Sequence, residues 1–309
     1  MKAVITGATG AVGMALIGAL RDRDIDVLVL CRPGSERNSR LMGLQGVRVV
    51  ECELSALKHF LADGEGKYDY FFHLGWGGTT GAARNDMFLQ NKNVEYALDA
   101  VQLASRLGCD VFVGAGSQAE YGRVEGKLSS QTPTNPENGY GIAKLCTGRM
   151  TRIMCEQLGI RHVWARILSV YGEYDGVNSM VMSTINKILN REIPEFTAGE
   201  QIWDYMYSAD AAQALLALAE RGKDGGTYCL GSGRPERLSE YITKIRDAVD
   251  PNAELGLGKI PYAKNQVMYL CADITELTRD TGFVPEYSFE AGIAKTVEWA
   301  KDSLRAKTK

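Results

Sequence analysis

The sequence predicts an α/β protein with a doubly wound parallel sheet and a smaller C-terminal α/β lobe. Residues 2–6 form a short apolar run with β-branched residues, which is typical of a buried strand. Glycines follow at 7, 10 and 13, and residues 14–20 then have apolar side chains at helical spacing. Further apolar runs, including a strand expected at 163–170, alternate along the chain with amphipathic segments, including helices expected at 180–189 and 238–249. This alternation is the pattern of parallel strands joined by helices.

The order strand, glycine loop, helix is that of a dinucleotide-binding turn. Gly7 lets the chain turn off the strand, Gly10 lets the backbone approach a pyrophosphate, and Gly13 lets the helix pack close to the sheet. The helix N-terminus offers N–H groups and a partial positive charge to the phosphates. The loop residues expected to bind the cofactor are Gly7, Thr9, Gly10, Ala11, Val12 and Gly13.

Composition excludes several other classes of protein. A net charge of −3 argues against a nucleic-acid partner, and no apolar run is long enough to span a membrane. None of the seven cysteines forms a Cys-x-x-Cys pair, and most lie in apolar runs, so we expect reduced thiols, no metal site and a cytoplasmic protein. The chain enters its first strand at once, so we expect no signal peptide.

The second strand, residues 25–30, bears on cofactor choice. An acidic residue that would hold the ribose hydroxyls of NAD is expected at its end, but Cys31 and Arg32 stand there. An arginine can instead pair with the 2′-phosphate of NADP, so we expect NADP, with Arg32 and Ser35 as ligands and NAD as the alternative. The alternative for Arg32 itself is a solvated loop position.

Two more strand ends are expected at the same crevice. The strand at 47–50 leads to Glu53 and Leu54, which we expect at this crevice or, for the acid, simply in water. The strand at 68–74 leads into a glycine-rich loop, where Leu74, Gly75 and Trp76 are expected to contact the cofactor and Gly77 the substrate. His73 is interpreted as a packed strand residue.

A second group of residues indicates chemistry. The strand at 111–115 is followed by Gly116 and Ser117, and Tyr140 and Lys144 lie four apart in a predicted helix and so share a face. A tyrosine beside an ammonium group has its pKa drawn toward neutrality and can exchange a proton with a substrate oxygen. Ser117 would hydrogen-bond that oxygen. We also expect the cofactor to contact Ala115, Gly116 and Ile167.

This combination resembles the extended branch of the short-chain dehydrogenase/reductase superfamily, which contains nucleotide-sugar epimerases, dehydratases and reductases. The resemblance covers nearly the whole chain and includes segments 166–172, 203–210 and 281–285. It implies a Rossmann domain and a nicotinamide cofactor whose ribose is held by Lys144 and whose adenine touches Glu53 and Leu54, where relatives often have Asp-Leu. It also implies a homodimer, in which two helices of each subunit, here 93–107 and 140–158, form the interface.

The resemblance does not by itself distinguish epimerase, dehydratase and reductase. The positions at which this chain differs from each of them indicate which one it is. Dehydratases have an Asp-Glu pair where this chain has Gln118 and Ala119, with Glu120 one position out of register. The missing acid after the second strand disfavours a 4-epimerase with tightly held NAD. An NADP-dependent ketoreductase fits better. The epimerase and a non-catalytic NADP-binding sensor stay open as alternatives.

Residues 193–204 resemble the corresponding stretch of NDP-4-keto-6-deoxyhexose reductases, including CDP-abequose and CDP-paratose synthases. Trp203 stands where many relatives have an arginine that binds the substrate diphosphate, so Arg191 or Arg234 is expected to replace it. The predicted substrate residues are Gly77, Ser117, Gln118, Ser169, Asn178, Arg191, Trp203 and Arg234. We expect residues 1–171 and 203–230 to form the cofactor domain, 172–202 and 231–309 the substrate lobe, and the tail after Trp299 to be frayed.

Overall fold

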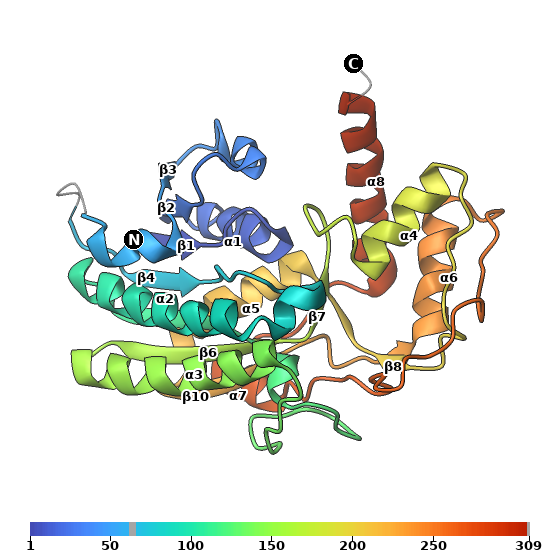
Figure 1. The fold of residues 1–309 in the computed structure, drawn as a ribbon. Coiled ribbons are helices and arrows are strands. Elements are labelled where there is room, and N and C mark those ends of the chain that lie inside the picture. The colour runs from blue at the N-terminus through green and yellow to red at the C-terminus, as the bar shows by residue number, and fades with distance from the viewer. Residues whose placement is uncertain (62–65, 308–309) are drawn as a thin grey trace.

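A computed structural model describes residues 1–61 and 66–307 (Figure 1). Its centre is a seven-stranded sheet in the order β10-β6-β5-β4-β1-β2-β3, in which every neighbouring pair is parallel. This order places the switch in winding direction between β1 and β4, where ligands bind in open α/β sheets. The strands are β1 (Lys2–Thr6), β2 (Asp26–Cys31), β3 (Val47–Glu51), β4 (Tyr70–His73), β5 (Val111–Ser117), β6 (Arg161–Ile167) and β10 (Gly226–Leu230).

Helices cover both faces of the sheet, as the doubly wound prediction requires (Figure 1). Helices α1 (Ala11–Arg21) and α5 (Ser208–Arg221) pack on one face, and α7 (Thr275–Thr281) lies beside α5. Helices α2 (Met87–Arg106) and α3 (Gly139–Leu158) pack on the other face and against each other. Short 3₁₀ turns are η1 (Glu36–Leu41), η2 (Leu54–His59), η3 (Gly81–Asn85) and η4 (Gln118–Glu120).

A smaller group of elements lies beyond the carboxyl ends of β5, β6 and β10 (Figure 1). It contains α4 (Met180–Leu189), α6 (Leu238–Val249) and α8 (Phe289–Lys307), with a core of interleaved aromatic rings that includes Tyr171, Tyr241 and Phe289. Two small sheets connect this group to the main sheet: β7 (Ser169–Tyr171) with β9 (Tyr205–Tyr207), and β8 (Ile202–Trp203) with β11 (Glu236–Arg237). The boundaries given above for two domains remain a prediction.

Three predicted elements differ from those in the structure. The strand expected at 163–170 is split, because Leu168 donates its N–H to Leu230 and the chain then pairs with β9 in a separate sheet. Helix α2 begins at Met87, six residues before the predicted start, because Asp86 accepts the N–H of Leu89 as an N-cap.

The interpretation of the residues after Trp299 as a frayed tail is wrong, since α8 continues to Lys307; residues 308–309 lie outside the described part. The helix is held there because Ile293, Val297 and Ala300 are buried on one face and the ring of Trp299 packs against Tyr174.

Helix α3 is fitted to the sheet by a single tryptophan. The indole of Trp164 on β6 lies against Gly114 and Gly116 on β5 and Gly148 on α3. At each of these glycines a Cβ atom would lie closer to the indole than real Cβ contacts allow. The large ring therefore fills a slot that only glycines leave open, and it fixes the separation of α3 from β5.

Among the described residues, six of the seven cysteines are buried, and all seven are unpaired thiols; Cys146 is exposed. The same residues contain no group of three His, Cys, Asp or Glu side chains arranged to hold a metal ion. None of the described helices has the length and apolar character needed to cross a membrane.

Candidate cofactor and active site

The glycine loop is packed as a cradle. Gly7 has a φ of +75°, and a Cβ atom there would lie 2.6 Å from the backbone of Gly75 in the loop after β4. A Cβ atom at Gly13 would lie 2.5 Å from the backbone of Ala8, so α1 is tucked against the loop that precedes it. Gly10 is the N-cap of α1 and has no side chain that could accept a hydrogen bond from the first turn. The backbone N–H groups of Ala11, Val12 and Gly13 are therefore available to a phosphate at the loop.

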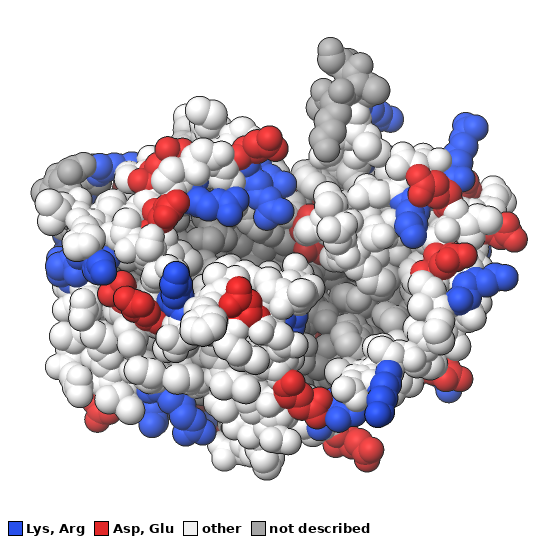
Figure 2. All heavy atoms as spheres, in the orientation of Figure 1, with Lys and Arg blue, Asp and Glu red and all other residues white. Residues whose placement is uncertain are grey.

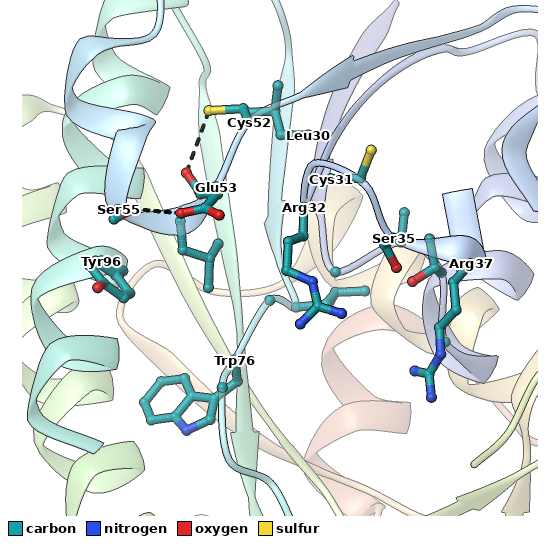
Figure 3. Close-up of a pocket in the computed structure, with 18 of the residues that line it drawn as sticks. Leu30, Cys31, Arg32, Ser35, Arg37, Cys52, Glu53, Ser55, Trp76 and Tyr96 are labelled. Carbon is teal, nitrogen blue, oxygen red and sulfur yellow. Dashed lines mark hydrogen bonds between the residues drawn. The ribbon is translucent and has the colours of Figure 1, made fainter. Parts of the chain in front are cut away.

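A cavity of about 470 Å³ opens at this loop (Figure 3). The residues predicted to contact the cofactor that line it are Gly7, Thr9, Gly10, Arg32, Ser35, Glu53, Leu54, Leu74, Gly75 and Trp76. Asn38 lines it as well, and its side-chain oxygen is buried without a hydrogen-bond partner among the described residues. The glycine cradle, the helix N-terminus and this unpartnered acceptor fit a dinucleotide.

Two arginines lie at the cavity near the end of β2. Arg32 and Arg37 both line the cavity, and the guanidinium of Arg32 points into it, whereas the thiol of Cys31 points away (Figure 3). Glu53 lies on the other side, where it accepts a hydrogen bond from Ser55 at 3.3 Å. On the surface, Lys and Arg side chains lie along one rim of the hollow that crosses this face (Figure 2).

The loop after β4 is fastened to α2 by two buried amides. Gln90 donates to the carbonyls of Gly78 and Ala83 and accepts from the indole nitrogen of Trp76, each at 2.9 Å. Asn93 accepts the N–H of Gly77 and donates to its carbonyl, also at 2.9 Å. Backbone and side-chain groups of this loop are thereby fixed, and so is the plane of the Trp76 ring.

Ser117, Tyr140 and Lys144 converge at the carboxyl end of β5. Tyr140 and Lys144 lie one turn apart in the first two turns of α3, and both side chains are buried. The Lys144 ammonium donates to the carbonyl of Ala115 at 2.6 Å, and its Nζ lies 3.7 Å from the ring centroid of Trp76. Ser117 Oγ accepts the N–H of Ala119 at 3.1 Å, a bond that does not use the hydroxyl hydrogen.

Trp76 lies between this trio and the cavity. Its ring lines the cavity and also meets the Tyr140 ring edge-on at 6.1 Å between centroids. Burial lowers the pKa of Lys144 to about 7, although the charge of Glu120 acts in the opposite direction. Burial raises the pKa of Tyr140 above its ordinary value, the opposite of the expected shift toward neutrality, although the Ser117 side chain and the Arg84 guanidinium act to lower it. Both groups therefore sit in a dry environment in which a nearby charge has a large effect.

Glu120, the acid one position out of register with the pair of the dehydratases, has a structural role. Its carboxylate is fully buried and accepts from the backbone N–H of Ser117 at 2.8 Å and from the indole of Trp164 at 3.0 Å. It also pairs with the Arg166 guanidinium at 2.6 Å. With its acceptor positions engaged by three donors, this carboxylate holds the end of β5 and does not face the cavity.

The structure brings together only some of the predicted substrate residues. Ser169 accepts a hydrogen bond from the indole nitrogen of Trp203 at 2.8 Å, and Gly77 lines the cavity. Gln118 begins η4 directly after Ser117. Asn178 is exposed before α4 and Arg191 is exposed after it, with a φ of +62°. Arg234 is exposed on another segment and donates to the carbonyl of Pro285 at 3.3 Å.

Sequence reasoning missed three features of the site. The guanidinium of Arg84 in η3 lies over the Tyr140 ring, and the two residues are 56 positions apart, so no local pattern connects them. The hydrogen bonds of Glu120 were also missed. The amides of Gln90 and Asn93 were missed because the helix was expected to begin only at residue 93, which leaves Gln90 outside it.

Curated dTDP-glucose 4,6-dehydratases are similar in sequence to part of this chain. A dTDP-glucose 4,6-dehydratase of Xanthomonas campestris pv. campestris is 25% identical over 201 residues, which are 61% of this chain and 57% of that protein. The chain spans little more than half the length of the curated dehydratases that it matches.

Solved structures share the fold over nearly the whole chain. A UDP-N-acetylglucosamine 4-epimerase from Methanobrevibacter ruminantium, in complex with UDP-N-acetylmuramic acid, has a TM-score of 0.87 at 22% identity and covers 98% of each chain. A UDP-glucuronic acid 4-epimerase from Bacillus cereus, in complex with NAD, has a TM-score of 0.84 at 19% identity and covers 98% of this chain and 99% of that one. The sequence profile of one family matches residues 3–231, roughly three quarters of the chain. This chain belongs to the NAD dependent epimerase/dehydratase family.

Proposed function

We propose that this chain is an NADP-dependent reductase of a nucleotide-linked keto sugar, acting at the sugar's 4-position. The observation that supports the proposal most directly is the convergence of Ser117, Tyr140 and Lys144 beside a cavity that the glycine loop lines. The cavity would hold the dinucleotide, with the pyrophosphate at the N-terminus of α1 and Arg32 at the 2′-phosphate. Bound there, the nicotinamide would supply the hydride.

The chain's own residues would manage the proton and the oxygen. Tyr140 gives its phenolic proton to the carbonyl oxygen as that oxygen gains negative charge. Ser117 donates its remaining hydrogen to the same oxygen and fixes its position. Lys144 stabilises the phenolate that remains and is proposed to hold the ribose of the nicotinamide. Trp76, held by Gln90, excludes water from the ammonium group.

A second candidate is a nucleotide-sugar 4-epimerase with tightly bound NAD. It is favoured by the two similar structures, which are 4-epimerases, one of them in complex with NAD. The same three residues serve either reaction, since an epimerase takes the proton and returns it. Against it stands the absence of an acid at the end of β2, where Cys31 and Arg32 lie. A dehydratase is disfavoured by Gln118 and Ala119, which replace an acidic pair.

The test is the identity and fate of the cofactor. The purified protein is passed through gel filtration, and the nicotinamide that stays bound is identified after denaturation. It is then given NADPH and nucleotide-linked 4-keto-6-deoxyhexoses, with Tyr140→Phe as the inactive control. The proposal expects an empty site that NADPH fills and stoichiometric oxidation of NADPH. Bound NAD with interconversion of sugar nucleotides and no net cofactor consumption supports the epimerase. Cofactor binding without turnover of either kind supports a sensor.

A further inference from the structure

The guanidinium of Arg84 covers one face of the Tyr140 ring. Its Cζ lies 4.3 Å from the ring centroid, within the range of a cation–π contact. Lys144 Nζ lies farther away, at 5.8 Å from the same centroid. Arg84 is therefore the nearer of the two cations to the phenol ring.

The segment that bears Arg84 is built against the start of α3. Asn85 accepts the N–H of Gly139 at 3.0 Å, and Arg84 donates to the carbonyl of Thr79 at 3.1 Å. Gly139 leaves no room for a Cβ atom, which would lie 2.7 Å from the sulfur of Met87 and 3.0 Å from the carbonyl of Arg84. The position of the guanidinium is thus set by close packing of η3 on the helix to which Tyr140 belongs.

Three charged side chains surround Tyr140, and they differ in how fully their charge acts on it. Lys144 lies below it on α3, Glu120 lies beyond Ser117 on η4, and Arg84 faces it from η3. Glu120 is paired with Arg166, whereas none of the ion pairs found within residues 1–61 and 66–307 involves Arg84. Burial lowers the pKa of Lys144 to about 7, so near neutral pH this ammonium is only partly charged. A guanidinium keeps its charge throughout the accessible pH range.

We propose that Arg84 is a positioning residue that acts through Tyr140: its guanidinium holds the ring in place and supplies the permanent positive charge that stabilises the phenolate. Lys144 alone would lose this influence as it deprotonates, and Arg84 would not. The inference rests on the proposed role of Tyr140 as the proton-exchanging group. It adds a second cation, from a loop 56 residues away in sequence, to the pair on α3.

The test follows the ionisation of Tyr140 directly, without cofactor or substrate. Protein labelled with ¹³C at tyrosine Cζ is titrated by NMR, and Tyr140→Phe assigns one signal among the 14 tyrosines. Arg84→Met should raise the pH at which Tyr140 ionises by about one unit, because the phenolate loses its nearest cation. Arg84→Lys should restore part of the shift. Lys295→Met, which removes one positive charge from the exposed face of α8, should leave it unchanged.

Two outcomes overturn the proposal. One is a Tyr140 signal that titrates at the same pH in Arg84→Met and the wild type. The other is a wild-type signal that stays neutral up to the pH of alkaline unfolding. A folded Arg84→Met, judged by its thermal transition, is the condition for the comparison, and Arg84→Lys provides the second variant. Because the titration needs no turnover, an absence of ketoreductase activity leaves its result intact.

Discussion

The indole of Trp76 covers the ammonium group of Lys144, with Nζ 3.7 Å from the ring centroid. The contact keeps water from a charged group that is otherwise buried in the fold. It also joins the cavity to the proton-exchanging residues, because the same ring lines the cavity. Since this contact is present without a cofactor, the effect of the buried ammonium on the free energy of unfolding can be measured on the cofactor-free protein.

Lys144→Met should stabilise the cofactor-free protein. Burial lowers the pKa of Lys144 from 10.5 to about 7, so below pH 10.5 the unfolded chain binds a proton more readily than the folded one. Stability is therefore lost as the pH falls from 10.5 toward 7. The contact with Trp76 returns up to about 2 kcal/mol, and we expect a net gain of about 1–3 kcal/mol for the variant at pH 7.

Urea unfolding at pH 7 and pH 9.5 measures this gain, which should shrink at the higher pH. Lys295→Met, at an exposed position, should change stability by less than about 0.5 kcal/mol. A Lys144→Met protein less stable than the wild type at pH 7 would show that the ammonium is well accommodated.

Tyr140→Phe should reduce turnover of a keto-sugar nucleotide by about 10²–10⁴-fold, because the ring stays and the proton donor is lost. The affinity of Tyr140→Phe for NADPH should stay nearly intact. Lys144→Met should lose both turnover and affinity for NADPH, because the residue serves the tyrosine and the ribose. Ser117→Ala should reduce turnover by roughly 10²–10³-fold with little effect on NADPH binding. Steady-state kinetics and cofactor titration separate these effects. The control is Tyr70→Phe, at the far end of β4, which should behave as the wild type; full turnover by Tyr140→Phe would contradict the mechanism.

Arg32→Glu should reverse cofactor preference. The guanidinium points into the cavity, and a charge-assisted bond to a 2′-phosphate contributes roughly 1.5–3 kcal/mol, equal to about 10–150-fold in affinity. NADPH should weaken by that factor relative to NADH, and Arg32→Lys should keep part of the preference. Binding is followed by fluorescence of the reduced cofactor. Equal weakening of both cofactors would remove Arg32 from the 2′-phosphate.

Helix α3 presents a row of exposed apolar side chains that suits a second copy of the chain. Ile142, Met150 and Ile153 are between 42% and 53% exposed. We expect a homodimer through α2 and α3, with twice the subunit mass of 33.8 kDa by light scattering at micromolar concentration. Ile153→Glu should produce monomers. Ile193→Glu, equally exposed but outside these helices, should leave the dimer intact, and a wild-type monomer would refute the interface.

Much of the fold could be predicted because its signals are local. The strand at Lys2–Thr6 and the helices at Met180–Leu189 and Leu238–Val249 begin and end where the periodicity predicts. The split after Ile167 could not be predicted, because apolar residues continue on both sides of Ser169 and only the partner of each strand distinguishes the two segments. The continuation of the C-terminal helix past Trp299 was missed because the helix packs on α4, α6 and β9, and Trp299 on Tyr174, all far away in sequence.

The candidate site could likewise be predicted only in part. The spacing of Tyr140 and Lys144 on one helix, and the glycine loop, are encoded by neighbouring residues and could be predicted as a constellation. The environment of these residues is not encoded locally. Arg84 and Trp76 approach Tyr140 from a loop held by Gln90, and Glu120 finds its partners on β6. Such contacts depend on packing between elements, which no periodicity in one element reveals.

The slot that holds Trp164 limits how this chain can be altered. Replacing a helix glycine by alanine is a routine route to heat tolerance, with a gain of up to about 1 kcal/mol at a suitable position. At Gly148 the added methyl group would press on the indole and push α3 off the sheet. Single replacements at Gly114 or Gly116 meet the same ring from the other side. The three glycines and the tryptophan can therefore change only in concert, with a smaller residue at 164 arriving before or together with any larger one facing it.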